Sequence, residues 1–274
     1  MNIIQTTLHI GVEKPFRVLH ATDTHLTYAD LRDGERKVAL AEKRARYFSK
    51  AAKMLDAIAK LSKEQDLPIL HTGDLIDFVS VANLEVCKRF TEENDCFMAA
   101  GNHEFSLYVG EAKEDAAYRE QSLAAVQAAF QNNIRMDARV IGGVNFVALD
   151  NGYYLFERAQ LDFLKSEVAK GLPVVVLFHT PLYERKLYDI NMGHAPAAYL
   201  TAVPEELMRS YPADRYEQQL ADAVTREAVD YIASEPCIKA IITGHLHRDY
   251  EGVFADRIPQ VMTACTTLRV IEIV

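Results

Sequence analysis

The sequence predicts a mixed α/β fold, and three observations support this. Five short apolar runs, each bounded by polar residues, have the length of buried strands. Longer segments between them carry apolar residues three and four positions apart, as in a helix packed on a sheet. The chain has 274 residues, 49% of them hydrophobic, which suffices for a large core. Because candidate site residues come from both halves, we expect one domain over residues 1–274.

The five strand-like runs all lead into side chains that bind metals. The runs and the stretches that follow them are Phe16–Thr22 before Asp23-Thr24-His25; Pro68–Leu70 before His71-Thr72-Gly73-Asp74-Leu75-Ile76-Asp77; Cys96–Ala100 before Gly101-Asn102-His103-Glu104; Pro173–Phe178 before His179; and Ile238–Thr243 before Gly244-His245-Leu246-His247. In open α/β sheets, ligands bind at the carboxyl ends of strands, so we expect these endings to surround one cleft.

Seven ligands are predicted in that cleft: Asp23, His25, Asp74, Asn102, His179, His245 and His247. They are more than one ion needs. Two ions about 3.5–4 Å apart, sharing a carboxylate, would use them all and form a clamp for displacement at phosphorus. Imidazole and oxygen without thiolate favour Mn²⁺ or Fe, with Zn²⁺ as a further candidate, over Ca²⁺ or Mg²⁺.

The remaining elements follow from periodicity. We expect an edge strand within residues 1–12 and one long helical stripe from Val38 to Ala59. The basic residues of this stripe are interpreted as a solvated face; they are Lys37, Lys43, Arg44, Arg46, Lys50 and Lys53. A further helix is predicted over residues 118–130, and Gly142-Gly143 predicts a hairpin turn.

The segment from Thr180 to Tyr216 is the least regular part of the sequence, with four prolines. A loop of this length in a compact domain is usually functional or disordered. Our hypothesis is a lid at about 180–216 that sets substrate choice. Its candidate phosphate contacts are Arg185, Lys186, His194 and Arg209. A helix near residues 220–232 follows, and the tail from Val253 to Val274 is expected to complete a second sheet.

The bulk charge narrows the choice of partners. With a net charge of −9 and a pI of about 5.5, the chain has no general attraction for nucleic acid or an anionic membrane. A small phosphoester fits better as substrate, and the oligomeric state is open. The four cysteines show no Cys-x-x-Cys spacing, and the first 16 residues lack the pattern of a signal peptide. We therefore expect a cytoplasmic protein with reduced thiols.

The order and the residues of the five motifs resemble those of the calcineurin-like metallophosphoesterase family. The family pattern is Asp-x-His, Gly-Asp-x-x-Asp, Gly-Asn-His-Glu or Asp, a lone His, and Gly-His-x-His, and all five blocks occur in order between Asp23 and His247. The resemblance implies a four-layer α/β/β/α sandwich, in which two mixed β-sheets are flanked by helices. Periodicity alone supports only a mixture of α and β.

The resemblance also implies roles for the site residues. It assigns Asp23, His25, Asp74 and His247 to one ion and Asp74, Asn102, His179 and His245 to the other, with Asp74 and a nucleophilic hydroxide bridging them. Asp77 would orient His103 and raise its pKa, so that His103 acts as general acid toward the leaving-group oxygen or stabilises charge on the phosphoryl oxygens. For Glu104, a role in loop hydrogen bonding and a catalytic role both remain open.

The predicted function is a dinuclear metal-dependent phosphoesterase. The resemblance favours a phosphodiester of a small molecule, such as a cyclic nucleotide, over a phosphomonoester. A phosphomonoesterase of the same family is the nearest alternative. A non-catalytic metal-binding scaffold belongs to another class, and a nuclease is disfavoured by the negative net charge.

Overall fold

Two mixed β-sheets form the centre of the molecule. The computed structural model describes residues 2–274. In spatial order, the first sheet contains β1 (Asn2–Leu8), β11 (Thr267–Ile273), β2 (Phe16–Ala21), β3 (Ile69–His71) and β4 (Cys96–Met98). The second contains β5 (Met136–Ile141), β6 (Val144–Leu149), β7 (Val174–Leu177), β8 (Ile238–Thr243), β10 (Ile258–Met262) and β9 (Tyr250–Phe254).

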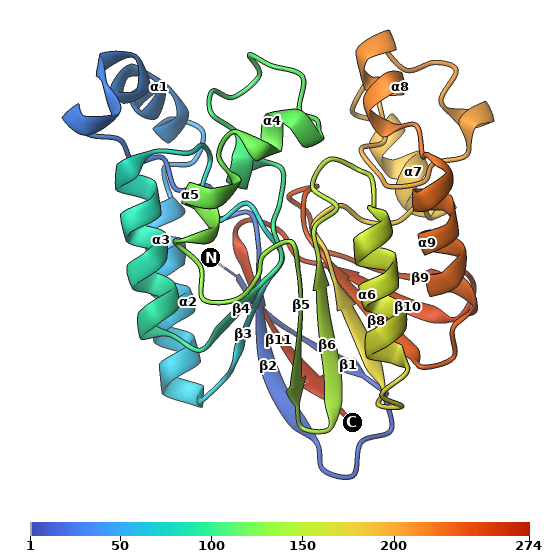
Figure 1. Ribbon diagram of the computed structural model, residues 1–274. Coiled ribbons are helices and arrows are strands. Elements are labelled where there is room, and N and C mark those ends of the chain that lie inside the picture. Colours follow the sequence, from blue (N-terminus) through green and yellow to red (C-terminus); the bar gives the residue numbers. More distant parts are fainter. Residues whose placement is uncertain (1) are drawn as a thin grey trace.

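Helices cover the outer face of each sheet (Figure 1). Two of them, α2 (Ala51–Gln65) and α3 (Val81–Glu93), lie on the first sheet, and α6 (Arg158–Val168) and α9 (Ala223–Ser234) lie on the second. The other helices are α1 (Glu35–Ala45), α4 (Ala116–Glu120), α5 (Leu123–Gln127), α7 (Arg185–Met192) and α8 (Ala213–Gln219), with 3₁₀ turns at Leu31–Asp33, His103–Phe105 and Glu205–Leu207. The predicted four-layer α/β/β/α sandwich is confirmed.

The alternation of side chains along each strand explains the three apolar layers. Val18 of β2 packs between the sheets, whereas the next residue, Leu19, packs under α2 and α3. In the same way, Val175 faces the first sheet and Val176 faces α6 and α9. Strands that are buried on both faces become continuous apolar runs, which is why these segments were recognisable in the sequence.

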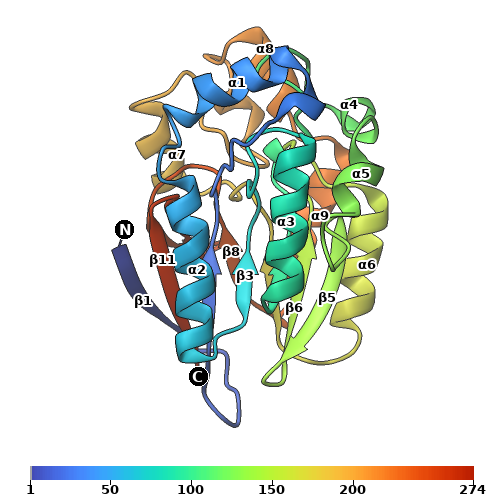
Figure 2. The ribbon, with the colours of Figure 1, turned by 90° about the vertical axis from the view of Figure 1, so that its left-hand side faces the viewer.

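The topology gathers polar loops at one end of the sandwich. Strands β2, β3 and β4 are parallel, and so are β6, β7 and β8, so within each set the carboxyl ends meet at one edge. Helices α1, α4 and α8 stand at one common end of the molecule in both views (Figures 1 and 2). No helix among residues 2–274 combines the length and apolar character needed to cross a membrane.

Several predicted elements need correction. The single stripe from Val38 to Ala59 is two helices, because residues 46–50 leave the helix and place Phe48 against the ring of His25. The stretch 118–130 is likewise divided between α4 and α5. In the tail, β10 joins the second sheet but β11 inserts between β1 and β2 of the first. An apolar strand carries no local signal for which of two sheets it joins.

The segment 180–216 is more regular than expected. It contains α7, a 3₁₀ turn and the start of α8, packed around an apolar cluster of its own. Tyr188, Leu200, Met208 and Tyr211 are buried in that cluster. Tyr188 and Tyr211 are therefore core residues of a small folded unit.

Candidate metal centre

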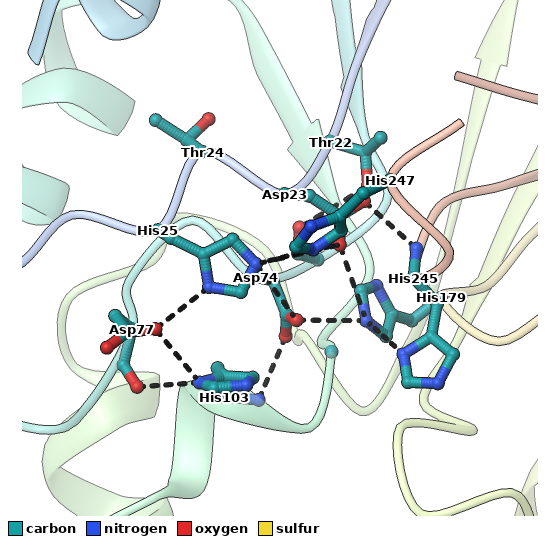
Figure 3. Close-up of polar contacts among 12 residues, drawn as sticks. Thr22, Asp23, Thr24, His25, Asp74, Asp77, His103, His179, His245 and His247 are labelled. Atoms are coloured by element: carbon teal, nitrogen blue, oxygen red, sulfur yellow. Dashed lines mark hydrogen bonds and ion pairs between the residues drawn. The ribbon is translucent and has the colours of Figure 1, made fainter. Parts of the chain in front are cut away.

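The loops after five strands bring six of the seven predicted ligands to one place (Figure 3), and Asn102 lines a pocket together with His245. Asp23 and His25 follow β2, Asp74 follows β3, Asn102 follows β4, His179 follows β7, and His245 and His247 follow β8. Asp23, His25, Asp74 and His179 are almost completely buried. The side chain of His247 is 37% exposed, so solvent reaches the centre from its side.

Asp23, His25 and His247 form the first group of donor atoms. His247 Nε2 lies 3.2 Å from Asp23 Oδ1 and 3.0 Å from His25 Nε2. One donor atom from each of the three residues falls within 4.8 Å of the others, which is close enough for all three to hold one cation. We call this set the first group.

Asp74, His179 and His245 form the second group. Asp74 Oδ2 lies 3.1 Å from His179 Nε2, and His179 Nε2 lies 3.1 Å from His245 Nδ1. The same Asp74 oxygen lies 3.6 Å from His25 Nε2 of the first group. Asp74 therefore stands between the two groups, where one carboxylate can serve both.

Unsatisfied buried oxygens show that the donor set fits cations. Among the described residues, Asp23 Oδ1 and Asn102 Oδ1 are buried without a hydrogen-bond partner. The other oxygen of Asp23 accepts from Thr22 Oγ1 at 2.7 Å and from the His245 amide at 2.9 Å. A buried oxygen without a donor costs about 1–3 kcal/mol, and a cation would remove that cost.

The outer nitrogens of three imidazoles are fixed by oxygen atoms. His25 Nδ1 donates to Asp77 Oδ1 at 3.1 Å, and His179 Nδ1 donates to the Thr72 carbonyl at 2.7 Å. His245 Nε2 pairs with the Tyr154 hydroxyl at 3.1 Å. In metal sites such partners orient the ring and leave the other nitrogen free to bind the ion.

The backbone at the site is strained. Five of the seven predicted ligands have positive φ: Asp23 (53°), His25 (51°), Asp74 (55°), His245 (73°) and His247 (52°). This left-handed region costs a residue other than glycine about 1–2 kcal/mol. Such strain persists only where the surrounding structure holds it, and it concentrates at functional sites. The tight turns let side chains two positions apart in one loop, such as Asp23 and His25, both reach the site.

Gly101 allows the loops to pack closely. A Cβ atom here would strike Asp74 Oδ1 and would lie 2.9 Å from His179 Nδ1. Only a residue without a side chain lets the loop after β4 approach the shared carboxylate. Close packing of the loops therefore requires a glycine at the first position of the Gly-Asn-His motif.

Comparison with known proteins decides the family. The sequence profile described as calcineurin-like phosphoesterase matches residues 16–249. The chain belongs to the calcineurin-like phosphoesterase family. The family implies two divalent metal ions, and the two groups of donors described above can hold them. No curated protein matches the chain in sequence.

Solved structures similar to this calcineurin-like phosphoesterase have low sequence identity with it. A dimetal phosphatase from Danio rerio is 14% identical with a TM-score of 0.51, covering 91% of this chain and 88% of its own. A 5'-nucleotidase from Staphylococcus aureus, itself assigned provisionally, is 14% identical with a TM-score of 0.48, covering 94% of this chain and 51% of its own. The phosphopantetheinyl hydrolase PptH from Mycobacterium tuberculosis is 11% identical with a TM-score of 0.44, covering 90% and 89%.

Glu104 ties two loops of this phosphoesterase together. Its buried carboxylate accepts hydrogen bonds at 2.7 Å from the backbone amides of Asp74, Leu75 and Gly101. Burial, and then the nearby charge of Asp74, raise its pKa to about 7, although the amide donors oppose the shift. Of the two roles left open, the structure supports loop hydrogen bonding.

Arg44 corrects the prediction that the basic residues of α1 form a solvated face. Its Nε donates to Asp77 Oδ2 at 2.6 Å and its Nη2 donates to Asp77 Oδ1 at 2.8 Å. Burial alone would raise the pKa of Asp77, but the hydrogen bonds from Arg44 and His25 lower it to about 2. Lys37 also turns inward, donating to the Val79 carbonyl. The sequence carried no signal for either contact.

His103 lies beside Asp77, as predicted, but its pKa moves in the opposite direction. Its Nδ1 donates to the Asp77 carbonyl at 2.7 Å and is 3.3 Å from Asp77 Oδ1. Burial lowers the pKa of His103 below its ordinary value, and the raising effects of Asp74 and Asp77 do not reverse this. The nearby charge of His25 adds to the lowering of this pKa. The tautomer fixed by the carbonyl leaves Nε2 without a proton in the neutral ring.

A pocket of about 500 Å³ adjoins the second group. Asn102, His103 and His245 line its inner end, and Arg215 of α8 lines its outer wall. None of the four predicted phosphate contacts in segment 180–216 (Arg185, Lys186, His194, Arg209) lines it. The basic residue of segment 180–216 that lines this pocket is Arg215, which was not among the predicted phosphate contacts.

Proposed function

We propose that the protein is a dinuclear phosphodiesterase for a small molecule, with the ligand assignment expected from the resemblance. The first ion would be held by Asp23, His25, Asp74 and His247, and the second by Asp74, Asn102, His179 and His245. The observation that carries the proposal is the position of Asp74 between the two groups, 3.6 Å from His25 Nε2 and 3.1 Å from His179 Nε2.

The ions, when bound, supply Lewis acidity toward water and toward the phosphoryl oxygens. The donor set of imidazole and oxygen favours Mn²⁺ or Fe, with Zn²⁺ as a further candidate. The protein contributes the pocket, which accepts a small ester beside Asn102 and His245. A cyclic nucleotide is the substrate that the sequence suggested, and a pocket of about 500 Å³ lies in the ordinary range for small ligands.

We assign His103 to proton transfer at the leaving-group oxygen. Its Nδ1 is held by Asp77, so Nε2 is the atom that exchanges a proton in the pocket. The lowered pKa leaves a small protonated fraction at neutral pH, and a bound phosphoester anion would increase that fraction. Asp77 and Arg44 act through His103 as positioning residues.

Chelator-stripped protein restored with Mn²⁺ provides the test, using bis-p-nitrophenyl phosphate as diester and p-nitrophenyl phosphate as monoester. We expect faster diester turnover, and a loss in kcat of about 10²–10⁴-fold in His103→Ala. His194→Ala is the matched control, because this histidine is exposed in segment 180–216 and does not line the pocket. Faster monoester turnover would move the assignment to a phosphomonoesterase. No turnover by metal-loaded protein would favour the scaffold.

The cellular setting remains part of the proposal. The described cysteines Cys87, Cys96, Cys237 and Cys265 are all free thiols, which agrees with a reducing compartment. We keep the cytoplasm as the predicted location and a small phosphoester as the predicted partner. Nucleic acid and membranes are not expected as partners, given the net charge of −9.

A further inference from the structure

The pocket beside the second group has two ends of different chemistry. Asn102, His103 and His245 form the inner end. The outer end lies between the loop 109–114 and helix α8, which belong to segments about 100 residues apart in the sequence. In Figure 1 the polypeptide before α4 and the helix α8 both stand at the end of the molecule above the sheets. The ester arm that stays on phosphorus when the leaving group departs would occupy this outer end.

The basic residues of the outer end are already paired. Lys113 Nζ lies 2.5 Å from Glu217 Oε1, which joins the two walls. Arg215 lies 3.4 Å from Asp214, and its Nη1 donates to Gln218 at 2.8 Å. Its guanidinium also stands 5.7 Å from the ring centroid of Tyr199. Each of the two cations already has an acidic partner, so the outer end offers no unpaired positive charge to an additional anion.

Glu114 is the charged lining residue that lacks a partner. Among residues 2–274 it forms no ion pair, whereas the lining acids Asp214 and Glu217 each have one. With two bases and three acids, the outer end has a formal charge of −1 when Glu114 is ionised. Burial, then the charge of Asp74, raise the pKa of Glu114 to about 7 against the effect of Arg215. A half-buried carboxylate in this state gains from a donor or a cation.

The remaining lining is shaped for a compact organic group. Tyr154 and Tyr199 both reach the pocket from backbone with positive φ, at 70° and 55°. The Tyr154 hydroxyl is occupied by His245, so this side chain offers mainly its ring. Val109 and Ala112 add apolar surface. The outer end therefore combines aromatic and apolar walls with one unpartnered carboxylate.

We propose that Glu114 selects phosphodiesters in which the arm that stays on phosphorus carries an amine or another N–H donor, and that the outer end rejects arms that carry a second phosphate or a carboxylate. This inference rests on the proposed phosphoesterase function, because it assigns the substrate class of the same centre. Glu114 is here a specificity residue that touches the substrate arm and takes no part in bond cleavage.

Three diesters that differ only in one arm provide the test: the 2-aminoethyl, ethyl and carboxymethyl esters of p-nitrophenyl phosphate. All release p-nitrophenolate, so the leaving group is constant and the arm alone varies. With Mn²⁺-loaded protein we expect kcat/KM to be at least about 10-fold higher for the aminoethyl ester than for the ethyl ester, with the carboxymethyl ester slowest. Glu114→Gln should reduce the preference for the aminoethyl arm over the ethyl arm to near unity.

The matched control is Glu206→Gln. Glu206 is an exposed glutamate of segment 180–216 that does not line the pocket. It should keep the wild-type order. Equal rates for the three arms, a preference for the carboxymethyl arm, or an unchanged preference in Glu114→Gln would overturn the proposal.

Calorimetry separates this proposal from the function on which it rests. If no ester is hydrolysed, the phosphoesterase assignment fails. Binding of 2-aminoethyl phosphate and of ethyl phosphate to the Mn²⁺-loaded protein then tests whether Glu114 prefers an amine-bearing arm. Tighter binding of the aminoethyl compound, lost in Glu114→Gln, would support the selective pocket alone. Equal binding of the two compounds would overturn it.

Discussion

The two groups of predicted ligands are supported in different ways. In the first group, His25 is fixed by side chains: Asp77 on its Nδ1 and the ring of Phe48, stacked at 4.1 Å. Asp77 in turn is held by Arg44 of α1. In the second group, His179 is fixed by a main-chain carbonyl and His245 by the Tyr154 hydroxyl. The first group depends on a peripheral helix, and the second depends mainly on the sandwich.

This difference shows how one fold can hold one group of metal ligands rigidly and leave the other group adjustable. A carbonyl at the end of a central strand moves only if the sheet moves, so the second group should tolerate changes outside the sandwich. Side chains of α1 can be replaced without disturbing a sheet. The first group should therefore respond to substitutions far from the ions, and the following predictions test this contrast.

The largest effect is expected at the one residue that both groups share. Asp74→Asn keeps the shape of the side chain but removes its charge, so bound Mn²⁺ should fall from about two ions per chain to about one or fewer. Metal content after dialysis measures this. Asp66→Asn is the control, since Asp66 also has positive φ but lies at the end of α2. Retention of two ions would show that the groups are independent and that Asp74 does not join them.

A smaller and one-sided effect is expected from Arg44→Ala. The change leaves the buried carboxylate of Asp77 without its bidentate partner and frees His25, so the affinity for the first ion should fall about 10–100-fold. The second ion should be affected little. Arg44→Lys should restore part of the affinity, and Arg46→Ala, on the exposed side of the same turn, should have no effect. Two-site calorimetry with Mn²⁺ distinguishes these outcomes, and equal losses at both sites would refute the contrast.

The smallest effect concerns pH. Burial alone would lower the pKa of each histidine in the two groups. Neighbouring carboxylates nevertheless raise the pKa to about 9 for His25, to about 11 for His247 and to about 9 for His179. For His245, burial prevails and the pKa is lowered to about 3. Below about pH 9 the ion-free first group thus holds about two protons and the second about one, and an ion must displace them. Affinity should rise with pH from 6.5 to 8.5 at both sites, more steeply at the first.

Calorimetry in buffers of different ionisation enthalpy counts the released protons for each ion. Equal proton release at the two sites would show that the groups titrate alike. Weaker Mn²⁺ binding at higher pH in this window would contradict the predicted direction of the pH dependence.

Much of this centre could be predicted because its chemistry is local in sequence. A strand, a turn and a ligand follow one another within a few residues, as in the run from Phe16 to His25, and parallel strands then place the ligands together. The contacts that orient the ligands are not local. Arg44 and Asp77 are 33 residues apart, and Tyr154 and His245 are 91 apart.

Residues with two plausible surroundings were the source of the errors. Arginine on an amphipathic helix is normally solvated, and nothing adjacent to Arg44 in sequence distinguishes it from Arg46. The apolar strand β11 could pair in either sheet, and only the assembled core places it between β1 and β2. The break at Phe48 was hidden for a similar reason, since the apolar spacing continues across it.

The left-handed backbone at five predicted ligands implies a conflict between stability and activity. At Asp23, His25, Asp74, His245 and His247, glycine would fit the local conformation better than the residue that is present. Substitutions that relax these turns would therefore tend to stabilise the chain and inactivate it together. A selection for thermal tolerance alone would erode this centre, whereas a selection for turnover would keep it, and the two kinds of selection would diverge first at these five positions.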